Sequence, residues 1–319
     1  MIYSVRHTTT FQYEPAVRES VMEVRMQPRS EGRQRCLSFK LDVSPAANIT
    51  QYRDFTGNTV HHFDIAGAHT QVKVTAHSNV EVQSARPPRN SDAGDWADLD
   101  ALAVADDHWE MMLPSEFARN GAALECLAAE LKCERSSRPL ELLTELNEGI
   151  YKSFAYVPNS TKVDSPIDEA LRTRQGVCQD FAHIMIALVR PLRIPCRYVS
   201  GYLFHRDTEQ ERDRSLEGAS HAWVEALVPR LGWVAFDPTN NLVGGDRHIQ
   251  VAIGRDYADV PPTRGVYKGE AHSKLSVAVR VSPSDAPPPE ESEPSIVIQS
   301  RPVFARVNSR AQHEQQQQQ

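Results

Sequence analysis

A cysteine, a histidine and an aspartate, in that order along the second half of the chain, are the residues most able to perform covalent chemistry together. Cys178 lies in the segment 174–188, where Gly176 is followed by apolar residues at helical spacing. This pattern predicts a buried helix with Cys178 in its first turn. The free amides and the positive dipole end at a helix start favour the thiolate, which is the nucleophilic form of cysteine.

An activated cysteine also needs a base within hydrogen-bonding reach. His183 is the nearest in sequence, but five residues along a helix correspond to about 500°, so its side chain diverges from that of Cys178 by about 140°. His221 is the better candidate for the base, and Asp237 is the candidate carboxylate that orients it. Both lie in neighbouring segments with strand-like patterns, which we expect to form a hairpin.

The register of this hairpin decides whether the histidine and the aspartate can meet. A five-residue loop, 228–232, would place Asp237 opposite Trp223 and on the same face as His221, as a diagonal neighbour at about 7 Å. A four-residue loop would pair Asp237 with Val224 and turn it away. The site therefore requires the longer loop or a bulge, without which the aspartate would only end a strand and open a turn.

The elements that must position these residues indicate an α+β protein. Residues 1–85 are rich in Val, Thr, Phe and Tyr with stretches of period two, which predicts an antiparallel β domain. Prolines and polar residues in 86–114 indicate a linker. Residues 115–282 carry helical and then strand patterns and form the expected catalytic core. The segment 283–319, rich in Pro, Glu and Gln, predicts a disordered tail, in which 296–298 could dock as an edge strand.

Within the core, serine and proline mark the expected helix starts. We expect one helix from Ser115 to about Cys133 and a second from Ser137 to about Phe154. The segment 194–204 has the pattern of a strand.

Composition and charge exclude several classes of function. The 319 residues carry a formal net charge of -7, which would repel a phosphate backbone, so we expect no nucleic-acid partner. The N-terminus lacks an apolar signal segment, and no apolar run approaches about 18 residues, so we expect no membrane partner and a cytoplasmic location. An odd number of irregularly spaced cysteines also favours reduced thiols: Cys36, Cys126, Cys133, Cys178 and Cys196.

Four motifs of the core occur in order with short gaps, and three further motifs lie in the β domain. The core motifs occupy 176–182, 194–202, 220–225 and 233–239, and those of the β domain occupy 5–13, 26–29 and 53–58. Over roughly residues 1–280 the chain thereby resembles the bacterial transglutaminase-like proteins. The resemblance implies a papain-like transglutaminase core preceded by an antiparallel β domain, with Cys178, His221 and Asp237 as its triad. It leaves the acyl acceptor open, because this core serves peptidases, amidases and cross-linking enzymes.

We therefore expect a thiol-dependent acyl-transfer enzyme acting on amide bonds of a peptide or protein, with hydrolysis slightly favoured over transamidation and without a cofactor. The backbone N–H of Cys178 and the hydroxyl of Tyr156 are the expected oxyanion donors. The alternative is a non-catalytic binding protein that retains the scaffold, although nothing structural requires Cys, His and Asp together. A redox thiol protein would need a second cysteine near Cys178. The sequence makes no prediction of oligomeric state.

Two other segments carry charged or metal-binding residue types. The mixed charges of 205–220 indicate a solvated loop, or a lid because the loop ends beside His221. His61, His62 and His69 have no cysteine or carboxylate at ligand spacing, so we expect no metal site.

Overall fold

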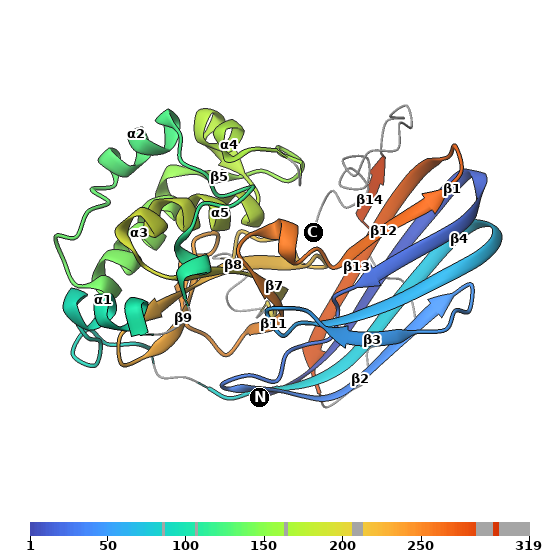
Figure 1. Cartoon of the computed structure of the whole chain (residues 1–319), viewed down its shortest axis with the longest axis horizontal. Helices are drawn as coiled ribbons and strands as arrows, with labels where there is room; N and C mark the ends of the chain where they lie inside the picture. The colour runs from blue at the N-terminus through green and yellow to red at the C-terminus, as the bar shows by residue number, and fades with distance from the viewer. Residues whose placement is uncertain (85–86, 106–107, 163–164, 206–212, 285–295, 300–319) are drawn as a thin grey trace.

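The computed structural model describes residues 1–84, 87–105, 108–162, 165–205, 213–284 and 296–299, and its elements form three layers (Figure 1). A large antiparallel sheet lies at one end, a second sheet of five strands lies in the middle, and the helices gather at the other end. A short parallel pair, β5 with β6, precedes the central helix. The α+β class expected from the sequence is confirmed.

The large sheet is built around two long strands that pair along most of their length. Strand β1 alternates buried and exposed residues at its start, as a sheet with one covered face requires. Its seven strands are β1 (Ile2–Val24), β2 (Gln34–Ser44), β3 (Thr50–Arg53), β4 (Thr59–Val82), β12 (Thr263–Lys268), β13 (His272–Pro283) and β14 (Ile296–Gln299).

Two predicted domain boundaries need correction. Strands β12 and β13 fall inside the predicted core, 115–282, yet both pair with β1 in the N-terminal sheet. Period-two patterns do not reveal which distant strand is the partner, so the sequence could not assign them. The predicted linker, 86–114, contains helix α1 (Trp96–Ala105) and the 3-10 turn η1 (Trp109–Met112), and Leu99 is fully buried in the core.

The end of the chain is described only in part. Strand β14 pairs antiparallel with β13, which confirms the edge strand expected at 296–298. The rest of the predicted tail beyond residue 284 lies outside the described residues.

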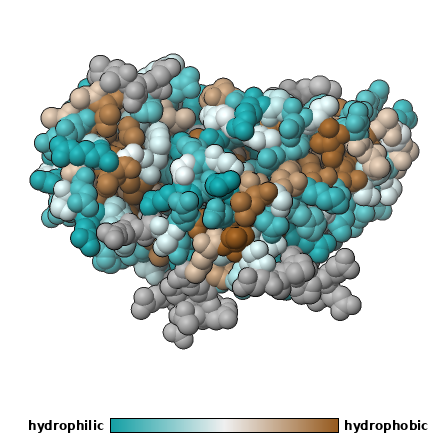
Figure 2. Space-filling model, turned by 90° about the horizontal axis from the view of Figure 1, so that it is seen from below, coloured by the Kyte–Doolittle hydropathy of each residue, from teal (hydrophilic) through white to brown (hydrophobic). Residues whose placement is uncertain are grey.

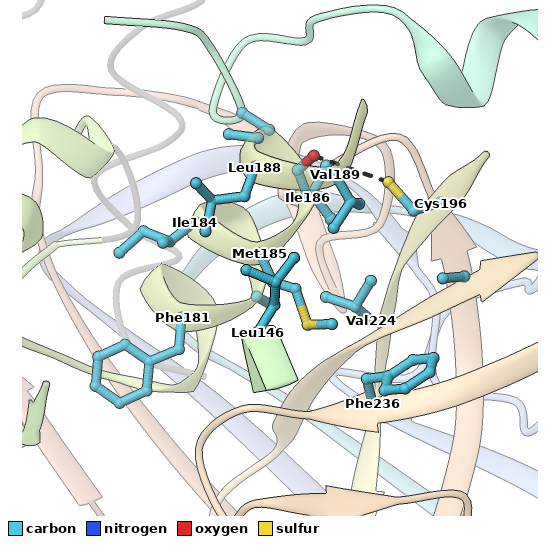
Figure 3. Close-up of a cluster of buried hydrophobic side chains, with 14 of the residues drawn as sticks. Leu146, Phe181, Ile184, Met185, Ile186, Leu188, Val189, Cys196, Val224 and Phe236 are labelled. Atoms are coloured by element: carbon cyan, nitrogen blue, oxygen red, sulfur yellow. Dashed lines mark hydrogen bonds between the residues drawn. The ribbon is translucent and has the colours of Figure 1, made fainter. Parts of the chain in front are cut away.

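The central sheet receives helix α5 (Cys178–Val189) on one face. All twelve residues of α5 are buried, and its apolar residues share one core with α3 and the sheet. Figure 3 shows Met185 directed toward Val224 and Phe236, with Leu146 beside it. In order across the sheet, the strands are β10 (Leu242–Val243), β9 (Gly232–Asp237), β8 (His221–Val228), β7 (Cys196–Leu203) and β11 (His248–Gly254).

Three further helices cover α5: α2 (Ala122–Glu130), α3 (Pro139–Ser153) and α4 (Ile167–Thr173). Helix α3 closely follows its predicted bounds, with Pro139 in the first turn. Helix α2 begins seven residues later than predicted. The backbone N–H of Phe117 donates to the buried carboxylate of Asp256 at 2.9 Å, so this stretch serves the core packing instead of continuing a helix.

The opposite face of the central sheet packs against the β domain. Tyr202 of β7 and Ile249 of β11 join the apolar core of the large sheet. The Tyr202 hydroxyl lies 2.9 Å from Nδ1 of His7, and the buried Asn58 side chain bonds both backbone groups of Ile253. These polar contacts fix the β domain against the core.

The surface is mixed in character. On the face seen in Figure 2, hydrophobic residues form separate patches among hydrophilic ones. Among the described helices, none combines the length and the apolar character needed to span a bilayer.

Candidate active site

Helix α5 begins at Cys178, as predicted, and its start is held by Asp180. The Asp180 carboxylate accepts hydrogen bonds from the backbone N–H of Val177, at 2.8 Å, and from the Thr161 hydroxyl. Burial raises the pKa of Asp180 to about 6. Gly176 permits the tight entry, because a Cβ there would come within 2.9 Å of the Asp180 carboxylate. Cys178 is thus fixed at a helix N-terminus, where its side chain is only 3% exposed.

The hairpin of β8 and β9 has the register that the site requires. Val228 pairs with Gly232 and Val224 pairs with Phe236, so the register is the one expected for the longer loop, although 228 and 232 themselves pair and only 229–231 lie between the strands. His221 and Asp237 consequently share a face, and Nε2 of His221 lies 2.8 Å from Oδ2 of Asp237. Both side chains are buried.

Five donors surround the Asp237 carboxylate. Oδ2 accepts from Nε2 of His221, from Nε2 of His248 at 3.1 Å and from the Asn240 amide at 2.9 Å. Oδ1 accepts from the backbone N–H groups of Thr239 at 3.0 Å and Asn240 at 3.2 Å. Burial alone would raise the pKa of Asp237, but His221 and His248 outweigh it and hold that pKa well below its ordinary value. Because an ionised carboxylate only accepts, both imidazoles donate from Nε2.

The same carboxylate sets the protonation of His221. Burial lowers the pKa of His221, but the charge and hydrogen bond of Asp237 outweigh burial, with a further contribution from the Cys178 thiol, and raise that pKa to about 10. Among the described residues, Nδ1 of His221 has no partner of ordinary hydrogen-bond geometry. Because Nε2 is bound to Asp237, the Cys178 thiol that favours the imidazolium interacts with the Nδ1 side of the ring.

His183 points elsewhere, as its helical position predicted. Its Nε2 accepts the backbone N–H of Tyr257 at 3.2 Å, and its ring stacks on Phe117. Burial lowers the pKa of His183 to about 4, so this side chain is neutral near pH 7. It belongs to the core packing of α5.

Tyr156 lies beside the helix start. It ends β5 (Ala155–Tyr156) and pairs with Gly176 of β6 (Gln175–Gly176), two residues before Cys178. Burial, followed by the nearby Cys178, raises the pKa of Tyr156, while the Leu216 backbone, which donates to the Tyr156 oxygen, lowers it in part. A surface depression of about 570 Å³ opens next to Tyr156, between Phe154, Arg174 and Arg214.

The described part of the charged loop, from residue 213 onward, is tied to the site through Asn240. The backbone N–H groups of Arg214 and Ser215 donate to Oδ1 of Asn240 at 2.7 and 3.1 Å. The Nδ2 of Asn240 in turn donates to Asp237. Residues 206–212, where most of the expected charge run lies, are outside the described residues.

Sequence reasoning missed Asn240 and His248. Asn240 had a local signal, because an Asn three residues after an aspartate can close a turn onto it. His248 had none: it reaches Asp237 only because β11 pairs with β7, placing His248 opposite Leu203. Ligand atoms of His221, Asp237 and His248 all lie within 4.8 Å of one another, a spacing that also suits a metal ion, but here the two imidazole N–H bonds to one carboxylate account for it.

A second cavity, of about 650 Å³, lies between the β domain and the central sheet. Its walls include Arg33 and Gln34 from the β domain and Trp223, Glu225 and His248 from the core. Cys178 is not among its lining residues, so this cavity is separate from the helix start.

Known proteins resemble this chain in both its β domain and its core. Residues 3–81 match the bacterial transglutaminase-like N-terminal region, and residues 127–238 match the transglutaminase-like superfamily. An uncharacterized protein of Mycobacterium leprae is 33% identical over 278 residues, which cover 87% of this chain and 97% of that protein. An uncharacterized protein of Mycobacterium tuberculosis is 35% identical over 301 residues, covering 88% and 92%.

Two further comparisons concern proteins with a described activity or structure. The protein-glutamine gamma-glutamyltransferase of Pseudomonas aeruginosa is 30% identical over 159 residues, which cover 45% of this chain and 23% of that enzyme. The crystal structure of a candidate cysteine protease from Cytophaga hutchinsonii matches with a TM-score of 0.71 at 22% identity, covering 93% of this chain and 96% of that one. The same fold therefore extends through both domains, and the chain belongs to the transglutaminase-like superfamily, with the bacterial N-terminal region of that family.

Proposed function

We propose that this protein is a thiol-dependent acyl-transfer enzyme that cleaves or exchanges amide bonds of a peptide or protein through Cys178, His221 and Asp237. The observation that carries the proposal is the buried His221–Asp237 hydrogen bond beside a cysteine at a helix N-terminus. The raised pKa of His221 favours an imidazolium near pH 7, and an imidazolium next to a thiolate is the resting form that suits attack on a carbonyl.

Each residue has a defined part in the reaction. The Cys178 thiolate forms a bond to the amide carbonyl carbon, and the carbonyl electrons move onto the oxygen. His221 gives its Nδ1 proton to the departing nitrogen, the C–N bond breaks, and a thioester remains on Cys178. Water or a primary amine then attacks the thioester, loses a proton to His221 and releases the cysteine as a thiolate. Asp237 holds the ring and compensates its charge during both steps.

The oxyanion of each tetrahedral intermediate needs donors beside the cysteine. The first-turn N–H groups of α5 have no intrahelical acceptor, so the N–H of Cys178 can donate there. The Tyr156 hydroxyl is the second donor: its oxygen accepts from the Leu216 backbone, so its own O–H stays available to the oxyanion. Tyr156→Phe should then lower kcat by about 10²-fold or more, with the fold intact.

The name of the Pseudomonas aeruginosa relative guides the choice of substrates. Glutamine side-chain amides belong in the first panel, together with peptide backbone amides, because that relative is a protein-glutamine gamma-glutamyltransferase. Water as acceptor gives hydrolysis and a lysine-like amine gives transamidation, and we favour hydrolysis. The cytoplasmic location and the absence of nucleic-acid and membrane partners stay predictions.

The test is an incubation of the purified full chain with peptides of both kinds, with and without a primary amine, followed by mass spectrometry of the products. A product in which the added amine has replaced the released ammonia or amine indicates transamidation, and a free carboxylic acid indicates hydrolysis. Cys178→Ala is the matched control, and it should yield neither product. Equal turnover by Cys178→Ala and the wild-type chain would overturn the proposal. Tight substrate binding by both chains without turnover would support the non-catalytic alternative.

A further inference from the structure

His248 is a buried histidine that contacts the candidate catalytic carboxylate directly. It begins β11, and its side chain is only 5% exposed. Its Nε2 lies 3.1 Å from Oδ2 of Asp237, the oxygen that also accepts from His221. Two imidazoles therefore share one carboxylate oxygen, although a single histidine would complete a Cys–His–Asp triad.

The His248 ring is packed against Trp223 and close to Gly245. The His248 ring meets the Trp223 ring at a centroid distance of 4.9 Å and an interplanar angle of 62°, and the Trp223 ring itself stacks near His221. The Nδ1 edge of the ring lies close to Gly245, where an added Cβ would come within 3.0 Å of it. Trp223 in turn lies over Gly201, where a side chain would collide with it. The ring thus has little freedom to leave Asp237.

We propose that His248 is a positioning residue that limits how strongly Asp237 holds the proton on His221. This proposal rests on the proposed function. In the reaction His221 must release a proton to the departing amine, so a carboxylate that holds the imidazolium too strongly slows that step. A second N–H donor on the same Asp237 oxygen neutralises part of the carboxylate's negative charge, so that less of it acts on His221. The donation also fixes the carboxylate plane, so that Nδ1 of His221 stays directed at Cys178.

Among the charged and titratable groups around His221, His248 is the one suited to weaken the hold of Asp237 on the His221 proton. Asp237 and Cys178 favour the imidazolium, while His205 is close enough to His221 for the two imidazoles to interact electrostatically. The Asn240 amide also donates to Oδ2 of Asp237, but its Oδ1 accepts from the backbone of Arg214, so replacing Asn240 would also release that loop segment. His248 is the group whose N–H can be removed without releasing that segment.

The test uses His248→Phe, which keeps the aromatic packing but removes the donor, and His248→Gln, which retains an amide donor. His183→Phe is the matched control, because it replaces another buried histidine that does not touch Asp237. The first readout needs no substrate: NMR of histidine-labelled full-length protein should show two exchange-protected imidazole N–H protons on Asp237. His248→Phe should lose one signal and shift the other, whereas Asp237→Asn should lose both.

The second readout is the pH profile of amide turnover. His248→Phe should lower kcat by about 10- to 100-fold, the range found for groups that orient a catalytic ligand, with little change in KM. The alkaline limb of its pH profile should move upward by roughly 0.5 to 1 pH unit, which corresponds to about half the free energy of one hydrogen bond to a charged group. His248→Gln should recover part of both effects.

The two readouts separate the possible failures. An unmoved or lowered alkaline limb in His248→Phe, or the same loss of kcat in His183→Phe, would overturn the positioning role. A single protected N–H signal in the wild-type chain would overturn the shared carboxylate itself. If both N–H signals appear but neither the wild-type chain nor any variant turns over an amide, the proposed function fails while the hydrogen-bond geometry stands.

Discussion

Replacement of Asp237 by asparagine should change the protonation of His221 at neutral pH. The substitution keeps the shape of the side chain but removes the charge that outweighs the burial of His221. With burial as the largest remaining influence, the pKa of His221 should fall from about 10 to 6.5 or below. The sign follows from the physics, because burial disfavours a charged imidazole and no other carboxylate contacts this ring among the described residues.

The size of the effect follows from these two values. At pH 7.5 a group with a pKa of about 10 is about 99.7% protonated, whereas one at 6.5 is about 9% protonated. The imidazolium population beside Cys178 should therefore fall at least about tenfold. Stability should fall as well, because five donors would face an amide in place of a carboxylate, and each unsatisfied donor costs about 1–3 kcal/mol.

The assay is the rate of Cys178 alkylation by iodoacetamide at pH 7.5, followed by peptide mapping. Cys126 is exposed and would compete, so the experiment uses a Cys126→Ser background. The other thiols react slowly, because burial raises the pKa of Cys36 and raises those of Cys133 and Cys196 to about 11. Asp237→Asn should react about tenfold more slowly, because the thiolate is the reacting species and loses its cationic partner.

Asp256→Asn is the matched control. Asp256 is also a buried aspartate that accepts backbone N–H groups, and its charge acts on His183. This control should lower the melting temperature without slowing alkylation of Cys178. An unchanged alkylation rate in folded Asp237→Asn, or an equal loss in Asp256→Asn, would refute the coupling between Asp237, His221 and the thiol.

Three further outcomes are expected. Cys178→Ala should abolish amide turnover yet keep the melting temperature within a few degrees, because the thiol contributes little packing; unfolding would favour a structural role. Gly201→Ala should destabilise by about 1–3 kcal/mol in urea titrations, because its Cβ would collide with the Ile249 carbonyl oxygen and the Trp223 ring; wild-type stability would contradict that packing. His221 has a raised folded-state pKa, so its stabilisation is complete below pH 6.5 and is lost as pH rises through about 10. The wild-type chain should accordingly have a larger free energy of unfolding than Asp237→Asn at pH 7, and this difference should shrink as the pH rises to 10. A difference that stays constant with pH would contradict the raised pKa.

Local patterns in the sequence were sufficient for the elements that carry the reactive groups. The helical stripe after Gly176 correctly placed Cys178 at the start of α5, because helix periodicity and a permissive glycine are local properties. Strand parity correctly identified the β8–β9 register that brings Asp237 toward His221. Both inferences concern residues close in sequence, so helix periodicity and strand alternation alone fix where their side chains point.

Tertiary structure decided which distant segments complete the sheets and the site. Strands β12 and β13 carry ordinary strand patterns, but their pairing with β1 depends on the meeting of segments more than 200 residues apart. His248 reaches Asp237 in the same way, through the pairing of β11 with β7. A period-two pattern specifies which face of a strand is buried but not its neighbour, so the second imidazole on the carboxylate could emerge only from the folded sheet.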